Sequence, residues 1–393
     1  MITIADYRRA EGHAHSLLSS WRIAEAHNLD TFARVGFPVR IESEREVGQL
    51  LDTMHEGRFE LFLREFDGLQ ASDMDLLVDA LVEFVRFQGH CLPWRNPILP
   101  IATMASCLAL FRKMRGFSPH FRRVLEVGPG CGYLSFFLRN HPTLENYSQI
   151  EACESFYLLQ SMVNRHLWGG RFVEDIVPPD HREIFSTYVT RDSWIGAPAE
   201  GPVPLDRSIF GKPVCFHFPW WSMARVAEHG EYFDVVSANA NLNEMTRSAL
   251  RDYMELFRRV LSPDGIFLVQ CTGAAAHGSI DELFDILAAS GFACVFCAMS
   301  GEVEFAAVQP HSARYVALNN LVMVREGHLL FKQAQGRDNF TSGMMIDKPW
   351  LRRMYFSPPG DRVTSAEVVE RVTKRLERSS SGAVETSAGR HPA

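Results

Sequence analysis

The feature that most constrains the fold is a strand, a glycine-rich turn and a helix that follow one another directly. The apolar run VLEV is followed by Gly128-Pro-Gly-Cys-Gly132 and then by YLSFFL. Glycines let the chain turn sharply and let a ligand approach the backbone. A helix that begins there offers free N–H groups and a positive dipole end, which suit a carboxylate or a polar cofactor edge. The unit therefore predicts a ligand-binding turn.

Beyond this turn, short apolar strands alternate with helical patterns. Strands are expected in VLEV, YSQIE, VCFHF, FDVVSA, IFLVQC, FACVFCAM and NNLVMV. Such alternation indicates a parallel sheet covered on both faces. Upstream, SDMDLLVDALVEFVRF and IATMASCLALFRKMR show helical periodicity, with Ser72 and Asp75 as the capping pair of the first. The expected fold class is α/β, a Rossmann-like sheet with helices on both faces, preceded by an α-helical N-terminal region.

Three regions are expected along the 393 residues. They are a helical cap over 1–118, a catalytic domain over 119–330 and a C-terminal extension over 331–393. Residues 169–211 are rich in Pro and Gly and predict a functional insertion or a mobile loop in the catalytic domain. The extension contains one surface helix, over 364–378, and ends in a tail whose composition is that of a disordered segment.

Charge and composition exclude several classes of partner. The net charge is −7 and no half of the chain carries a basic excess, so neither nucleic acid nor an anionic membrane is expected to bind. No apolar run is long enough to cross a bilayer, and the first residues lack the apolar core of a signal peptide, which predicts a cytoplasmic protein. The sequence contains no tight cluster of acidic residues that would predict a metal site.

The eight cysteines lie mostly in apolar runs and are expected to be buried, reduced thiols. Cys294-Val-Phe-Cys297 has the spacing of a redox or metal motif, but no second CxxC and no histidine accompany it. A strand with thiols on both faces is therefore expected there.

The spacing of the glycine turn separates two cofactor classes. A dinucleotide fingerprint needs a third glycine at position 133, where this chain has Tyr133. The observed pattern E-x-G-x-G-x-G resembles motif I of class I S-adenosylmethionine-dependent methyltransferases. The resemblance implies that the acid helps to place the methionine end of the cofactor and that the glycines make room for it. The residues that it assigns to S-adenosylmethionine in this turn are Glu126, Gly128, Pro129, Gly130 and Gly132.

Further segments extend the resemblance over about residues 120–326. Glu151 ends YSQIE, where an acidic residue grips ribose hydroxyls in this family, and a carboxylate accepts two hydrogen bonds at once. FDVVSANANLNEM matches the fourth-strand region, and Asn239 at the end of that strand is a candidate contact for the methionine group. Asn241 and Asn243 have the alternative role of capping the next helix. Trp220 is expected either to cover the adenine face or to be a core aromatic.

Within the family, the chain is most similar to bacterial sugar O-methyltransferases, through FPWW followed by NANLNEM. This similarity implies a small-molecule acceptor, either a sugar or another polar secondary metabolite, methylated on a hydroxyl. It leaves the identity of the acceptor and the choice between O-, N- and C-methylation open. The chain departs from the family pattern where His217-Phe-Pro-Trp220 replaces the acid that often precedes the adenine contact, and in its long insertion.

A hydroxyl acceptor reacts faster when a base removes its proton during attack. His217 and Glu244 are the candidate bases, because both are expected at the carboxyl ends of strands, where this fold places its ligands. His277 is a third candidate. The alternative interpretation is a hydrogen-bonded structural histidine and a glutamate at a helix N-terminus.

Two rival functions stay open. An oxidoreductase that uses a nicotinamide dinucleotide is disfavoured by Tyr133. A non-catalytic scaffold with a methyltransferase-like fold, binding a protein through the helical region, has no physical need of the glycines and both acids. The apolar N-terminal helices would support a homodimer or cover their own core.

Overall fold

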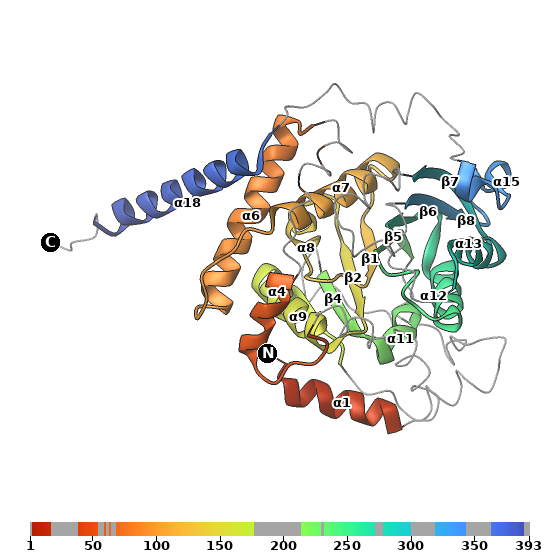
Figure 1. The fold of residues 1–393 in the computed structure, drawn as a ribbon, viewed down its shortest axis with the longest axis horizontal. Helices are drawn as coiled ribbons and strands as arrows, with labels where there is room; N and C mark the ends of the chain where they lie inside the picture. Colours follow the sequence, from red (N-terminus) through yellow and green to blue (C-terminus); the bar gives the residue numbers. More distant parts are fainter. Residues whose placement is uncertain are drawn as a thin grey trace.

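The computed structural model describes residues 2–16, 38–53, 59, 63, 68–176, 214–228, 232–271, 278–299, 319–342 and 363–388. Within these residues, eight strands form one sheet in the order β3-β4-β2-β1-β5-β6-β8-β7 (Figure 1). The strands are β1 (Arg123–Val127), β2 (Asn146–Glu151), β3 (Phe172–Glu174), β4 (Val214–Pro219), β5 (Phe233–Asn239), β6 (Leu261–Gln270), β7 (Phe292–Met299) and β8 (Asn319–Arg325). The pairs from β3 to β6 are parallel, and β8 runs antiparallel to both of its neighbours.

The strand order places a topological switch point between β1 and β5. Strands β2, β4 and β3 lie on one side of β1, and β5, β6, β8 and β7 lie on the other. Because crossover connections are right-handed, the connecting helices of the two halves cover opposite faces of the sheet. Ligands of such sheets bind in the crevice at the carboxyl ends of the strands beside the switch point. The predicted α/β class is confirmed, and the order is that of the Rossmann-like methyltransferase sheet with β3 added at one edge.

Helices flank the sheet in two groups. One contains α7 (Ile101–Phe117), α8 (Ser135–Leu138) and α9 (Glu154–Trp168), and the other contains α11 (Met223–Glu228), α12 (Arg247–Val260) and α13 (Ile280–Ala289). The predicted apolar stripe of α12 is confirmed, since Leu250, Tyr253, Met254, Phe257 and Val260 are all buried. The remaining helices are α1 (Ile4–Ser16), η1 (Glu44–Glu46), α4 (Val47–Thr53), α6 (Ala71–Cys91), η2 (Gly169–Arg171), η4 (Trp220–Ser222), α15 (Phe331–Ala334), α16 (Asn339–Ser342) and α18 (Ser365–Ala388).

The structure differs from the sequence prediction at three elements. Strand β8 is antiparallel, because an apolar run predicts a buried strand but not its direction. Helix α6 begins at Ala71, with Gln70 at the N-cap and no side-chain cap, so Ser72 lies inside the helix instead of capping it. Strand β3 lies within the segment that was expected to be an insertion, most of which falls outside the described residues.

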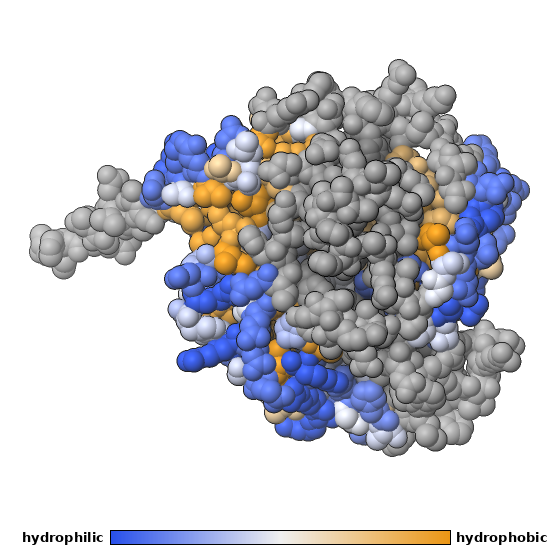
Figure 2. All heavy atoms as spheres, in the orientation of Figure 1, coloured by the Kyte–Doolittle hydropathy of each residue, from blue (hydrophilic) through white to orange (hydrophobic). Residues whose placement is uncertain are grey.

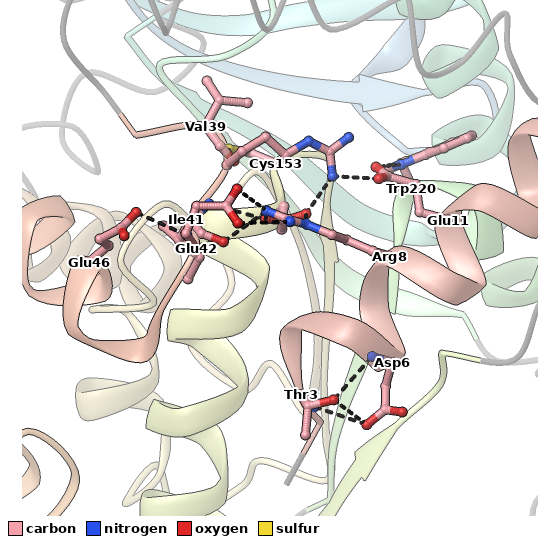
Figure 3. Close-up of polar contacts among 12 residues, drawn as sticks. Thr3, Asp6, Arg8, Glu11, Val39, Ile41, Glu42, Glu46, Cys153 and Trp220 are labelled. Atoms are coloured by element: carbon pink, nitrogen blue, oxygen red, sulfur yellow. Dashed lines mark hydrogen bonds and ion pairs between the residues drawn. The ribbon is translucent and has the colours of Figure 1, made fainter.

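The N-terminal segment docks beside the carboxyl end of the sheet. The ring of Tyr7 in α1 lies 5.0 Å from that of Tyr157 and 5.1 Å from that of Trp221. Arg8 donates two hydrogen bonds of 3.0 Å to the buried carboxylate of Glu154, at the start of α9. Arg40 binds the same carboxylate and that of Glu11 in α1. Figure 3 shows Arg8 and Glu11 reaching from α1 into this network. The N-terminal residues therefore lie close to the carboxyl ends of the strands, where ligands of such sheets bind.

Replacing Glu154 by Ala is expected to lower the free energy of unfolding by about 1–2 kcal/mol, because Arg8 and Arg40 lose their shared partner while staying partly exposed to water. Burial alone would raise the pKa of Glu154, but the hydrogen bonds from Arg8 and Arg40 lower it. The contribution is therefore present above the ordinary glutamate pKa and is lost as the pH falls below it. Urea denaturation at pH 7 and pH 4 measures this. Glu42→Ala, which removes an exposed carboxylate on Arg8, is the control and should change little.

The C-terminal helix α18 lies against α6 and projects from the body (Figure 1). The helix expected at 364–378 is confirmed, but it continues to Ala388, into the segment whose composition predicted disorder. Once a helix is nucleated, each further residue adds one hydrogen bond at low cost. Figure 2 shows apolar residues gathered beside this contact, whereas most of the rest of the described surface is hydrophilic. The homodimer that the apolar N-terminal helices would support stays a prediction. None of the described helices is long and apolar enough to traverse a bilayer.

Candidate functional site

The glycine turn lies directly after β1, at the switch point. Gly128, Gly130 and Gly132 have φ values of +65°, +58° and +71°, in the left-handed region that only glycine enters readily. A Cβ atom on Gly128 would overlap the side-chain amide of Asn241, which donates to the carbonyl of Val127. The backbone here can therefore be approached closely only while these positions stay glycine.

The rest of the turn is tied to the sheet by backbone hydrogen bonds. The Gly128 N–H donates to the carbonyl of Ile150 in β2 at 2.9 Å, and the Pro129 carbonyl accepts from the Gly132 N–H at 3.0 Å. Helix α8 begins only at Ser135 and has four residues, shorter than the helix predicted from YLSFFL. Such a helix has little macrodipole, so the turn attracts a carboxylate or another anionic group less strongly than a longer helix would.

Glu126 is a buried acid in β1, two residues before the first glycine. Glu126 is 2% exposed to solvent, and its carboxylate accepts a hydrogen bond from the Tyr147 hydroxyl. Burial raises the pKa of Glu126 to about 7, the Tyr147 hydrogen bond lowers it and the charge of Glu151 raises it further. A positively charged ligand group beside this carboxyl would favour its ionised form.

Glu151 ends β2 and faces the glycine turn. One carboxylate oxygen accepts from the backbone N–H groups of Ala152 and Cys153 at 2.8 and 2.9 Å, and the other accepts from the Gln160 amide at 2.7 Å. Burial raises the pKa of Glu151 to about 7, against the lowering effect of these donors and of the Gly130 N–H. Sheet and turn thus hold the predicted ribose acid in one orientation, beside the predicted cofactor turn.

The structure places the two remaining candidate cofactor residues at the same edge of the sheet. Asn239 is the last residue of β5 and is half-buried, next to Ala240, whose φ is +58°. Trp220 follows β4 and is buried. Its indole N–H donates to Glu11 at 3.4 Å and its ring lies 5.2 Å from that of His15. Trp220 therefore contacts α1, and its role at the adenine stays a prediction.

His217 lies inside the sheet and not at its edge. The strand VCFHF continues to Pro219, which pairs with Glu151, so His217 pairs two positions earlier with Gln149. The ring is fully buried, stacks on Tyr157 at 3.9 Å, and has partners on both nitrogens, Gln160 and Ser161. Burial lowers its pKa to about 3. This arrangement corresponds to the structural interpretation of His217, because neither nitrogen is left for an acceptor hydroxyl.

Glu244 lies in the turn after β5 and is half-buried, before α12 begins at Arg247. It stays the candidate base, whereas His277 lies outside the described residues. The alternative role of Asn241 and Asn243, capping the next helix, is not seen at α12. The side chain of Thr246 accepts from the Ala249 N–H and caps α12, while Asn241 binds the strand β1 backbone. Thr246, directly before the helix, carries the usual Thr cap signal, which the neighbouring asparagines obscured.

Two residues of the site escaped the sequence prediction. Gln160 and Asn241 bind the backbone around the glycine turn, at Gly130 and Val127 respectively. Gln160 lies on α9 in an ordinary helical pattern. The only sequence signal that could have identified it is its position about one and a half turns into the helix that follows Glu151.

The prediction of buried thiols is confirmed in the described residues. Seven of the eight thiols are buried, and none forms a disulfide. Cys294 and Cys297 lie in β7, where the Cys297 thiol donates to the carbonyl of Phe340. The prediction of thiols on both faces of β7 is wrong, because a register shift pairs Cys294 and Cys297 with Met323 and Leu321, which share one face of β8. No group of three or more His, Cys, Asp and Glu side chains in the described part of the chain could hold a metal ion.

No protein-family model and no curated protein sequence matches this chain. Solved structures resemble it at low identity. The ribosomal protein L11 methylase of Lactobacillus delbrueckii subsp. bulgaricus is 13% identical, with 59% of this chain and 90% of that chain covered and a TM-score of 0.31. Magnesium protoporphyrin IX methyltransferase of Synechocystis PCC 6803, with bound SAH, is 10% identical, with 62% and 93% covered and a TM-score of 0.33.

An O-methyltransferase family protein of Burkholderia thailandensis is 14% identical, with 72% of this chain and 68% of that chain covered and a TM-score of 0.33. Likenesses at this level identify no activity, and a fold alone does not determine function. The assignment of the fold class therefore rests on the sheet order and its switch point in this chain.

Proposed function

We propose that this protein is an S-adenosylmethionine-dependent methyltransferase. The observation that supports it most is the contact between the glycine turn and Glu151: three glycines of positive φ stand beside an acid at the end of β2, and the Gly130 N–H faces that acid. A ribose needs such a paired acceptor, and a cofactor edge needs such an open backbone.

The charges at the site favour a cationic cofactor. Glu126 and Glu151 are both buried beside the turn, and burial raises the pKa of each to about 7. S-adenosylmethionine carries a sulfonium and an ammonium group, which favour ionised carboxylates nearby, whereas the pyrophosphate of a dinucleotide would be repelled by them. The four-residue α8 offers little dipole to offset that repulsion.

The residues present fit this cofactor. Glu151 would accept from the ribose hydroxyls, Glu126 would face the methionine end, and the turn from Gly128 to Gly132 would admit both. When bound, S-adenosylmethionine supplies an electrophilic methyl group. The chain's own contribution is to hold an acceptor oxygen in line with that methyl group, and alignment alone accounts for much of the rate of such displacements.

A hydroxyl acceptor, on a sugar or another polar metabolite, is the substrate class that we propose from the sequence similarity. Glu244 is the residue that we propose as the base, because it lies in the turn after β5, where the switch point opens. It would take the proton from the acceptor hydroxyl as the oxygen attacks.

Calorimetric titration with S-adenosylhomocysteine tests the cofactor class. We expect micromolar binding of S-adenosylhomocysteine and none of NAD or NADH by the same preparation. Binding of NADH alone would instead support an oxidoreductase. Absence of binding by all three would favour the scaffold. If S-adenosylhomocysteine binds, turnover with a panel of sugars and polar metabolites then distinguishes an enzyme from a scaffold that kept its cofactor.

A further inference from the structure

A chain of buried hydrogen bonds runs behind Glu151 and ends at the sheet edge. The Gln160 amide nitrogen donates to the Gly130 carbonyl at 2.6 Å and to the Glu151 carboxylate at 2.7 Å. The Gln160 amide oxygen lies 2.8 Å from His217 Nε2. His217 Nδ1 lies 3.2 Å from the hydroxyl of Ser161, which also bonds to Glu174. One glutamine therefore joins the glycine turn, the ribose acid and a histidine.

The partners of Gln160 determine where the protons lie. Its amide nitrogen faces two acceptors, so a flipped amide would set its oxygen against both of them. The amide oxygen must then receive a hydrogen bond, which requires the proton of His217 on Nε2. Nδ1 then carries no proton and can accept the hydrogen of the Ser161 hydroxyl, for which the Glu174 carboxylate competes. Because burial lowers the pKa of His217 to about 3, the ring stays neutral in this tautomer at ordinary pH.

Burial makes this orientation costly to change. Gln160, Ser161 and His217 are fully buried, and the His217 ring is stacked on Tyr157 at 3.9 Å with an interplanar angle of 11°. A fully buried amide that lost its partners would keep its desolvation cost, so the Gln160 amide tolerates only one orientation. The hydrogen bond from Gln160 therefore fixes the orientation of the Glu151 carboxylate as well.

We propose that Gln160 and His217 are positioning residues for the cofactor ribose. Gln160 holds the Glu151 carboxylate and the Gly130 carbonyl in register, and His217 holds the Gln160 amide. This inference rests on the proposed function, since it assigns the ribose of S-adenosylmethionine to Glu151. His217 thus acts on the cofactor site through hydrogen bonds and not as a base for the acceptor.

The test compares two ligands, S-adenosylhomocysteine and its analogue without the two ribose hydroxyls, by calorimetry on the full chain. Wild type should bind the first more tightly. Gln160→Met should lower this preference about tenfold, because the ribose contact depends on the orientation of Glu151. The freed Gly130 carbonyl should lower the affinity for both ligands to the same extent, so that the affinity for the analogue falls less than that for S-adenosylhomocysteine. Asn164→Leu is the matched control, because Asn164 is equally buried one turn along α9 but bonds to Ser135 and Gln149 instead.

His217→Phe keeps an aromatic ring on Tyr157 and should lower the preference in the same direction, which provides a second variant if Gln160→Met fails to fold. In the ¹⁵N spectrum of histidine-labelled wild type, the His217 signal, assigned by its loss in His217→Phe, should show a proton on Nε2 and no titration above pH 5. A titration near pH 6.5, or an equal loss of affinity for both ligands in Gln160→Met, would overturn the inference. Failure of wild type to bind S-adenosylhomocysteine would overturn the proposed function, and the inference with it.

Discussion

Gly130→Val is expected to weaken the binding of S-adenosylhomocysteine at least 100-fold while the protein still folds. The φ of Gly130 is +58°, and a β-branched residue there is strained by about 1–3 kcal/mol. Relief of that strain would move the Gly130 N–H away from Glu151 and its carbonyl away from Gln160. Calorimetry measures the affinity, and thermal denaturation shows that the variant is folded.

Gly170→Val is the control for this substitution. Gly170 lies in η2, has no positive φ, and an added Cβ would meet no atom within 4 Å. It should bind like wild type. Near-normal affinity in Gly130→Val would contradict the assignment of the turn to the cofactor, whereas a loss of affinity in both variants would indicate a general effect of the valine.

Glu126→Gln is expected to stabilise the protein without cofactor by about 3 kcal/mol at pH 8 and by less than about 1 kcal/mol at pH 5. The native pKa of Glu126 is about 7, against an ordinary value of 4.5, and one pKa unit corresponds to about 1.4 kcal/mol. Between these two values the native state binds more protons than the unfolded state. Stability therefore falls as the pH rises from 4.5 to 7 and is constant above. A glutamine carries no charge and escapes that loss.

Urea denaturation of both proteins at the two pH values measures the difference. Glu42→Gln is the control, because the Glu42 side chain is 76% exposed and its neutralisation should give no gain that grows with pH. The same Glu126→Gln variant should bind S-adenosylhomocysteine about tenfold more weakly, since a charged partner of the ammonium group is lost. Equal stability of variant and wild type at pH 8 would show that Glu126 is not a buried, destabilised acid.

The sequence predicted the strands and the two acids because both depend on local patterns. VLEV and YSQIE are short strands whose acids lie at or one residue before their carboxyl ends, and parallel strands bring those ends to one edge. His217 was predicted at the carboxyl end of VCFHF. The strand runs two residues beyond it, to Pro219, so that the histidine lies in the interior and not at the edge.

Contacts between elements could not be predicted, because they do not depend on local sequence patterns. Gln160 lies one and a half turns into α9, and nothing in a helical pattern shows which strand end that turn faces. The Arg8 to Glu154 contact joins residues 146 positions apart, and Asn241 reaches the backbone of a strand 114 residues earlier. Such pairings depend on the packed sheet and not on local sequence.

The docking of α1 also bears on the order in which the chain folds. Its partners, Glu154 and Trp220, are synthesised long after it, with separations of 146 and 209 residues. Contacts of such separation form late, because the long loop must close first. Helix α1 is thus made well before its partners and is among the last elements to find its place. Until η4 is made, Tyr7 has no Trp221 beside it, and the nascent chain carries a partly covered aromatic that chaperones are suited to bind.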